Sequence, residues 1–334
     1  MIRTLWYLEA SDTVPYDNLA LEAYLLETVQ PGECILYLWQ NRRTVVIGKN
    51  QDAWNECKVE ALEADGGYLA RRPSGGGAVY HDLGNLNFTF VAVGEDYSVD
   101  RQLEVLLAAV FELGIHAEKS GRNDVTIEGR KFSGNAFSQK GNKHCHHGTI
   151  MINVDKENLS HYLKVSAEKL KTKQVASVRS RVCNLNEYCP ELTVDDIKSK
   201  MRSAFGHIYG LPIQEMRDVP GRLDWSRIEE LQEKFASWDW NYGRKVKADS
   251  RFQKRFAWGG LDMQIIVYEG KIEDIVLYSD ALEVEYIEKM RNVILSTPYT
   301  SKALVERMET SEPKGPIQRQ MQLDMVQWMA EWFE

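Results

Sequence analysis

The sequence lacks the features of a secreted, membrane-spanning or nucleic-acid-binding protein. Its five cysteines are scattered and form no CxxC pair, so it favours reduced thiols over a disulfide framework. No apolar run approaches the roughly 20 residues that cross a bilayer, and the first residues lack the basic-then-apolar order of a signal peptide. Lysine and arginine number 41 against 49 aspartates and glutamates, and this net charge of −8 argues against general nucleic-acid binding. These absences predict a cytoplasmic protein.

What is present is an ordinary globular composition. With 43% hydrophobic and 27% charged residues, the chain is neither disordered nor collagen-like nor a disulfide-dense mini-fold. A length of 334 residues corresponds to about two domains of roughly 150 residues each. Polarity rises and periodicity lapses near residue 245. We therefore expect a larger domain over residues 1–245, a linker over 246–251 and a smaller domain over 252–334.

Hydrophobic periodicity predicts a sheet-centred first domain and a smaller α+β second domain. Two connections are specific: Asn41-Arg42-Arg43 suits a hairpin between the first two strands, and Glu128-Gly129 suits a two-residue turn that places Lys131 on a strand. Thr193 and Asp196 have capping-box spacing at a helix start. Strands are expected at 33–40, 44–48, 68–71, 85–93, 125–133 (as two strands), 147–154, 256–268 and 271–278, and helices at 11–30, 53–64, 101–113, 193–209, 226–236 and beyond 282.

A glycine-rich segment, RRPSGGGAVYHDLGN over residues 71–85, is the densest chemical signal. The consecutive Gly75, Gly76 and Gly77 allow backbone N–H groups to converge on an anion, and the two arginines before them suit a phosphate. Neither GxxxxGK[ST] nor GxGxxG is present, so the segment is neither a P-loop nor a dinucleotide fingerprint. The alternative is a flexible connection between strands.

A second signal is Lys131 on its predicted strand. The small residues Ser133 and Gly134 follow it, so its side chain has room to enter a pocket and bind a carboxylate or phosphate. Most lone lysines instead lie on the surface. Asp124, near a strand start, offers the oxygen that Mg²⁺ prefers, but a single aspartate leaves the metal ligands unknown.

The run His144-Cys145-His146-His147 is a third signal. Alternate side chains of a strand point to opposite faces, so these four residues cannot surround one metal ion, and no second CxxC or HxxxH completes a zinc site. Cys145 beside a histidine is also a candidate nucleophile. The remaining interpretation is that Cys145 fills a small buried space and His147 bonds a neighbouring loop.

A fourth signal is a basic stretch in an acidic protein. Residues 164–181 contain six lysines and arginines and one acid, Glu168. Such a patch can steer an acidic partner, or it can be a solvated loop.

Taken in this order, the segments resemble the lipoate–protein ligase A family. RRPSGGGAVYHDLGN is similar to that family's RR-x-SGGGAV-[FY]-HDLGN signature, and SGRNDV followed by EGRKFSG is similar to its second motif. HHGTIMINVD, SVRSRVCNL and the late FAWGG match further family segments, so the resemblance spans nearly the whole chain. It implies an α+β fold with a large mixed-sheet catalytic domain of biotin/lipoyl-ligase type followed by a smaller accessory domain.

The resemblance also implies a two-step reaction and its partners. Lipoate and MgATP would give lipoyl-AMP and pyrophosphate, and the lipoyl group would pass to a lysine of an acceptor. The implied acceptors are the lipoyl domains of 2-oxoacid dehydrogenase E2 subunits and the glycine cleavage H protein. No nucleic acid and no membrane is expected as a partner.

Site residues follow from the same resemblance. Lys131 would be catalytic and would contact both lipoate and ATP, while Arg72, Gly77, Ala78, Val79 and Tyr80 would line the nucleotide site. Further candidates are Ser74, Gly75, Gly76, Asp124 and His147. Trp39, Val46 and Val79 are candidate apolar walls for the dithiolane chain, and the alternative for each is a place in the hydrophobic core. A fixed cation suits this chemistry, because adenylation brings two anions together.

Two alternatives remain open. Cys145, which a ligase does not require, would suit an octanoyltransferase or lipoyl amidotransferase that forms a thioester without ATP. The accessory domain argues against that reading, because transferases of this kind generally lack it. The second alternative is a non-catalytic lipoate-binding protein, against which the intact Arg72, glycines and Lys131 argue.

Overall fold

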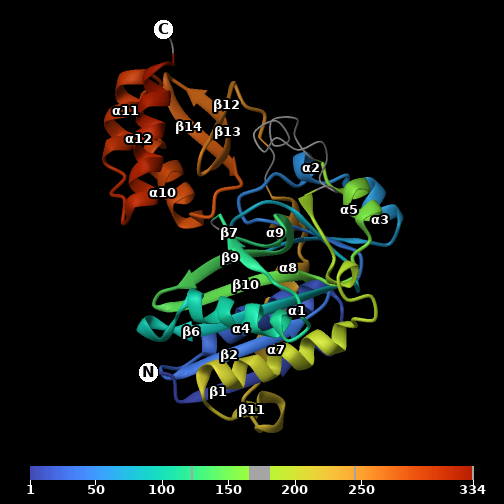
Figure 1. The fold of residues 1–334 in the computed structure, drawn as a ribbon. Coiled ribbons are helices and arrows are strands. Elements are labelled where there is room, and N and C mark those ends of the chain that lie inside the picture. The colour runs from blue at the N-terminus through green and yellow to red at the C-terminus, as the bar shows by residue number, and fades with distance from the viewer. Residues whose placement is uncertain (122, 165–180, 244–245, 333–334) are drawn as a thin grey trace. The chain divides into compact units, whose positions relative to one another are not determined.

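The computed structural model describes residues 1–121, 123–164, 181–243 and 246–332 (Figure 1). The chain divides into two compact units. The first contains residues 1–47, 53–72 and 78–241, and the second contains residues 242–334 together with two short segments, 48–52 and 73–77. The domain limits expected from the sequence stay predictions, and the observed division places all three glycines of the motif in the same unit as the C-terminal residues.

The first unit is built on a mixed eight-stranded sheet with the order β11-β1-β2-β6-β10-β9-β8-β7. The β11–β1 and β1–β2 pairs are parallel, and the remaining pairs are antiparallel. Its central strand β6 is buried at every position. The strands are β1 (Thr4–Glu9), β2 (Glu33–Trp39), β6 (Asn85–Val93), β7 (Glu118–Ser120), β8 (Asp124–Ile127), β9 (Arg130–Lys140), β10 (Lys143–Met151) and β11 (Ile213–Glu215).

Helices cover both faces of this sheet (Figure 1). On the face that we call the α4 face, α4 (Val99–Phe111) and α7 (Val194–Tyr209) pack over Phe88 and Phe90 of β6. On the opposite face, the α1 face, α1 (Pro15–Thr28) and α8 (Trp225–Ala236) pack over Val91 and Val93. The two-residue alternation expected for this strand is confirmed, and both sides of it are core.

Several local predictions are confirmed at the atomic level. The Thr193 hydroxyl accepts from the Asp196 N–H while the Asp196 carboxylate accepts from the Thr193 N–H, so the capping box at the start of α7 is present. The predicted helix over 53–64 is instead divided into α2 (Ala53–Glu56) and α3 (Val59–Ala64). Two other short helices are α5 (Lys156–Tyr162) and α9 (Trp238–Tyr242).

The hairpin predicted at Asn41-Arg42-Arg43 is wrong. Strand β3 (Thr44–Ile47) does not pair with β2 but lies at the centre of a separate sheet, between β4 (Tyr68–Arg71) and β5 (Val79–His81). Both edges of β2 are already occupied, because it pairs with β1 on one side and β6 on the other. Sequence proximity favoured a hairpin, and pairing with distant strands overrode it.

The second unit carries an antiparallel sheet β12-β13-β14 and three helices. Strand β12 begins within the expected linker and continues beyond it. The sequence did not predict this strand because only one of its faces is covered, so polar residues alternate along it. Methionines form much of this core, including Met263, Met290, Met308 and Met325. The elements are β12 (Ser250–Phe256), β13 (Gly259–Tyr268), β14 (Lys271–Ser279), α10 (Val284–Ile294), α11 (Ser301–Glu309) and α12 (Pro316–Ala330). Across the described ranges, no helix combines the length and apolar character needed to cross a bilayer.

Two histidines of the first unit are buried in their neutral form. Burial lowers the pKa of His81 from 6.5 to about 3, and the nearby positive charge of Arg72 adds to this effect. Burial also lowers the pKa of His146 to about 3, where its ring lies against the amides of Gln102 and Asn135. Below pH 6.5 the unfolded chain therefore binds protons that the folded chain excludes until about pH 3.

We predict that stability is full above pH 6.5 and falls as the pH drops from 6.5 towards 3. Each of the two histidines contributes a slope of about 1.4 kcal/mol per pH unit over most of this window. Denaturation midpoints measured at half-unit pH steps test this. A His146→Gln variant should show a shallower slope than the parent, and an identical slope would contradict the assignment.

Candidate active site

A β-bulge places Lys131 on the α1 face of the sheet. In a regular strand, residues 131 and 134 would point to opposite faces. The β8–β9 register shifts between Val125 and Thr126, so β9 contains an extra residue. The Lys131 side chain consequently lies across Gly134, and a Cβ at Gly134 would come within 2.5 Å of its Nζ. The turn at Glu128-Gly129 connects the two strands of the hairpin, and the bulge changes the face of the sheet to which the Lys131 side chain points.

Asp124 is the ion-pair partner of Lys131. Its Oδ1 lies 2.6 Å from Nζ, and the two side chains are 24% and 29% exposed. A half-buried ammonium with one short carboxylate contact is held in place yet remains open to solvent. The predicted turn and strand are therefore observed, as is the space that Gly134 leaves for the Lys131 side chain.

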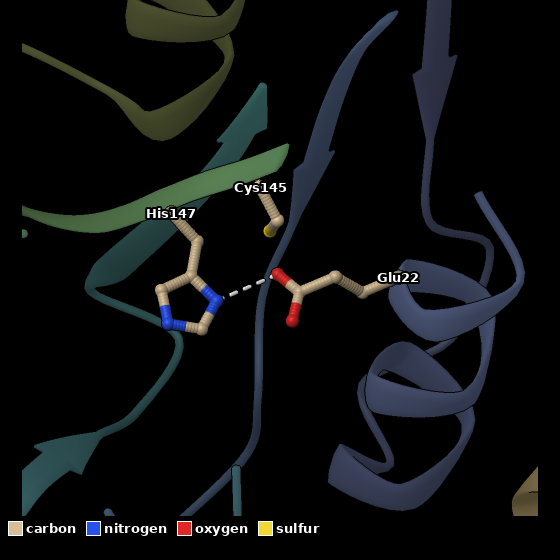
Figure 2. Close-up of side chains that lie close together, drawn as sticks. All are labelled: Glu22, Cys145 and His147. Carbon is tan, nitrogen blue, oxygen red and sulfur yellow. Dashed lines mark hydrogen bonds and ion pairs between the residues drawn. The ribbon is translucent and has the colours of Figure 1, made fainter. Parts of the chain in front are cut away.

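Three buried side chains, Glu22, Cys145 and His147, lie close together on the α1 face (Figure 2). Glu22 reaches from α1 to His147 on β10, with 2.8 Å between its Oε1 and Nδ1. The same oxygen accepts a 2.6 Å hydrogen bond from Thr89, whose hydroxyl accepts from the Trp39 indole. His147 thus bonds a residue of helix α1.

Cys145 lies beside this pair, as the alternation of a strand requires. Its sulfur, Glu22 and His147 form the one cluster with metal-compatible donors in the described part of the chain, with all donor atoms within 4.8 Å. His146 belongs to the opposite face, so the expectation that the four-residue run cannot hold one ion is confirmed. Burial, followed by the negative charge of Glu22, raises the pKa of the Cys145 thiol well above its usual range. A buried thiol that resists deprotonation is a poor nucleophile.

The two arginines of the motif have different surroundings. Arg71 is structural, because its guanidinium donates to the carbonyls of Trp240 and Asn241 and thereby anchors α9. Arg72 is buried and donates to the Val46 carbonyl. Burial lowers the pKa of Arg72 to about 10, and Glu22 opposes that effect, so it stays a cation at neutral pH. The arginine that the family resemblance selects is thus the one beside the buried network.

The residues predicted to line the nucleotide site fall in two places. Val79 lies on the side of β5 that contacts the α1-face core, whereas Tyr80 packs against Tyr162 with ring centroids 5.7 Å apart. Ala78 belongs to the first unit, and Ser74, Gly75, Gly76 and Gly77 belong to the second. Trp39 and Val46 are members of the α1-face core, as expected of apolar walls or of ordinary core.

Part of the glycine requirement comes from packing within the second unit. The Gly76 N–H donates to the Ala281 carbonyl, and Gly76 has a φ of +90°. A Cβ on Gly75 would lie 2.3 Å from that same carbonyl oxygen. At least one N–H of the expected anion nest is thus already paired with the protein.

His81 was missed by the sequence analysis, although it lies inside the quoted motif. The Asn18 amide donates to the Gln40 carbonyl and to Asn41, which fixes the orientation of Asn41. The Asn41 Nδ2 therefore donates to His81 Nδ1, and the neutral ring carries its proton on Nε2. Among the described residues this buried N–H has no partner. The signal in the sequence that would have identified it is a histidine that follows the apolar residues after the glycines.

The basic stretch is largely outside the described residues, which end at Lys164 and resume at Arg181. Its proposed role in partner binding stays a prediction.

We predict that Gly75→Ala destabilises the second unit by about 1–3 kcal/mol, because its methyl group would overlap backbone. The matched control is Gly77→Ala, since a Cβ there meets nothing within 4 Å. Thermal midpoints of the two variants test this, and equal midpoints would contradict the packing explanation.

The chain matches known families and relatives over most of its length. The family description "Lipoyl protein ligase A/B catalytic domain" matches residues 14–206, and "Bacterial lipoate protein ligase C-terminus" matches residues 245–329. A lipoate-protein ligase A from Psychrobacter cryohalolentis is 35% identical over 332 residues, covering 96% of this chain and 97% of the relative.

Solved structures of lipoate ligases share the fold. P. falciparum LipL1 in complex with lipoate superimposes with a TM-score of 0.84 at 26% identity, covering 98% of this chain and 99% of the other. A bipartite lipoate protein ligase from Thermoplasma acidophilum, described with its E2 lipoyl domain, gives 0.63 at 28%, covering 74% and 100%. A lipoate-protein ligase A bound with ATP gives 0.62 at 25%, covering 73% and 99%. The chain belongs to the lipoate–protein ligase A family and is an ATP-dependent lipoate–protein ligase.

Proposed function

We propose that Lys131 is the residue at which this ligase brings its two anionic substrates together. In the first step the lipoate carboxylate attacks the α-phosphate of ATP, and pyrophosphate leaves. In the second step a lysine of the acceptor attacks lipoyl-AMP, and AMP leaves. Both anions meet in the first step, so a fixed cation between them offsets their repulsion and stabilises the charge of the transition state.

The observation that carries this proposal is the geometry at the bulge. Strand β9 holds the lysine, Gly134 leaves space for its side chain, and Asp124 fixes the ammonium at 2.6 Å. Arg72 supplies a second, buried cation on the same unit. In this proposal Arg72 and the segment Gly77-Ala78-Val79-Tyr80 bind the nucleotide, and Ser74, Gly75, Gly76 and His147 are further candidates.

Magnesium enters this proposal with the nucleotide. Asp124 is the acidic residue nearest to Lys131 in the contacts described, and that lysine already neutralises it. One paired carboxylate is not a dedicated Mg²⁺ site, whereas Mg²⁺ commonly retains waters and binds substrate phosphates. We therefore propose that ATP phosphates provide most of the metal's ligands. The bound ion would neutralise phosphate charge.

The proposed acceptors are the lipoyl domains of 2-oxoacid dehydrogenase E2 subunits and the glycine cleavage H protein. The T. acidophilum ligase was described together with an E2 lipoyl domain, which supports the first class. We propose that the reaction takes place in the cytoplasm. All five cysteines are free, as a reducing compartment requires.

Lys131→Ala should reduce the rate of adenylate formation by about 10²–10³-fold, because one preorganised electrostatic contact is lost. The assay measures pyrophosphate release and lipoyl-AMP from lipoate and MgATP. Lys140→Ala, on the same strand but exposed and paired with Glu27, is the matched control. Near-parental adenylation by Lys131→Ala would refute the role, and absence of adenylate from the parent protein would favour the non-catalytic alternative.

Cys145→Ser should retain ligation within a few-fold of the parent, since the thiol is buried and protonated at neutral pH. Two activities of the variant are measured. One is ligation of lipoate to an acceptor in the presence of ATP, and the other is transfer of an octanoyl group from an acyl carrier protein to the same acceptor. Loss of both activities on this substitution, with the fold intact, would revive the cysteine-dependent transferase.

A further inference from the structure

One buried side chain on the α1 face carries an N–H donor that has no hydrogen-bond acceptor among the described residues. Asn87 of β6 is only 2% exposed, and its Nδ2 has no hydrogen-bond partner. Its Oδ1 accepts a 3.0 Å hydrogen bond from the Asn85 Nδ2, and the Nδ2 of Asn87 is the end of the amide that has no partner among the described residues. A buried donor left unpaired costs about 1–3 kcal/mol. Such a group in a native protein calls for a ligand or another explanation.

The position of Asn87 connects it to Lys131. Asn87 pairs across the sheet with Trp39 on one side and Thr149 on the other. The Thr149 hydroxyl in turn accepts from the Gly134 N–H, and the Lys131 side chain lies across Gly134. The backbones of Asn87 and Gly134 are thus separated by one intervening strand, a distance of about 10 Å. The amide and the ammonium extend from either side of a short threonine on the same face.

A second unpaired donor lies near Trp39. The His81 and Trp39 rings are 6.3 Å apart, and the His81 Nε2–H has no partner among the described residues. Two buried donors therefore flank one wall of the predicted lipoyl pocket. Two independent unpaired donors around a single tryptophan indicate that a ligand with hydrogen-bond acceptors belongs there.

We propose that Asn87 is a substrate-binding residue whose Nδ2 donates a hydrogen bond to the acyl oxygen of the lipoyl group. This inference rests on the proposed role of Lys131, which holds the same end of the substrate. In the transfer step the acceptor amine forms a bond to the acyl carbon, and the carbonyl oxygen becomes negative. The bond from carbon to the AMP oxygen then breaks, AMP leaves with the bonding pair, and the amine loses its proton to solvent.

A neutral amide suits this oxygen better than a further cation. The carbonyl oxygen is uncharged in lipoyl-AMP and carries charge only while the tetrahedral intermediate exists. A preorganised donor therefore binds the transition state more strongly than the ground state. Asn87 stands on the most buried strand of the sheet, where its position is fixed by pairing on both sides.

The test measures transfer from preformed lipoyl-AMP, so that adenylation does not limit the rate. Asn87→Asp keeps the acceptor for Asn85 but removes the donor, and Asn87→Leu removes both at similar volume. Each should lower kcat for transfer to a lipoyl domain by about 10²–10³-fold, with a smaller change in KM. The same loss is expected with hydroxylamine as the nucleophile, because the effect does not depend on acceptor docking.

Lys140→Ala, which is exposed and paired with Glu27 on strand β9, is the control and should stay within a few-fold of the parent. Near-parental transfer by a folded Asn87→Leu or Asn87→Asp protein would overturn the proposal. If Asn87→Leu fails to fold, the near-isosteric Asn87→Asp decides the question. The parent and Lys131→Ala, assayed for adenylation in parallel, report separately on the ligase function and on the lysine.

Discussion

The burial of β6 on both faces is the constraint on which the first unit depends. A strand with no solvent-exposed face must satisfy every polar side chain inside the protein. On the α4 face the strand avoids this cost with phenylalanines. On the α1 face it carries Asn87 and Thr89, and Thr89 is satisfied through Trp39 and Glu22. Burying polar groups at the centre of a sheet costs desolvation free energy and so lowers stability. The same burial gives an active site hydrogen-bond donors of fixed position.

Local patterns predicted local structure well. The alternation of β6, the Glu128-Gly129 turn and the capping box at Thr193 each depend on a few neighbouring residues, and each is present. The resemblance to lipoate ligases identified the family, the fold and the reaction. These features depend on short-range stereochemistry or on motifs that a single sequence is enough to identify.

Features that depend on distant partners were not predictable. The bulge that turns Lys131 arises from the register between β8 and β9, which no residue type specifies. Glu22 lies on a helix whose other residues are largely apolar, and only the fold shows that it faces His147. The connection after β2 resembled a hairpin because the competing pairing with β1 and β6 is not local. Arg71 and Arg72 are adjacent and of one residue type, yet only tertiary contacts distinguish the anchor from the candidate ligand.

The methionine-rich core of the second unit ties its packing to redox conditions. Thioether side chains fill irregular space because they are unbranched and flexible. Oxidation of Met290 or Met325 to a sulfoxide would place a polar S=O group among buried Ile and Trp side chains, where an unpaired polar group is costly. The unit that holds the three glycines of the motif would then be destabilised. Oxidative damage would then reach this ligase through the methionine side chains that pack the second unit.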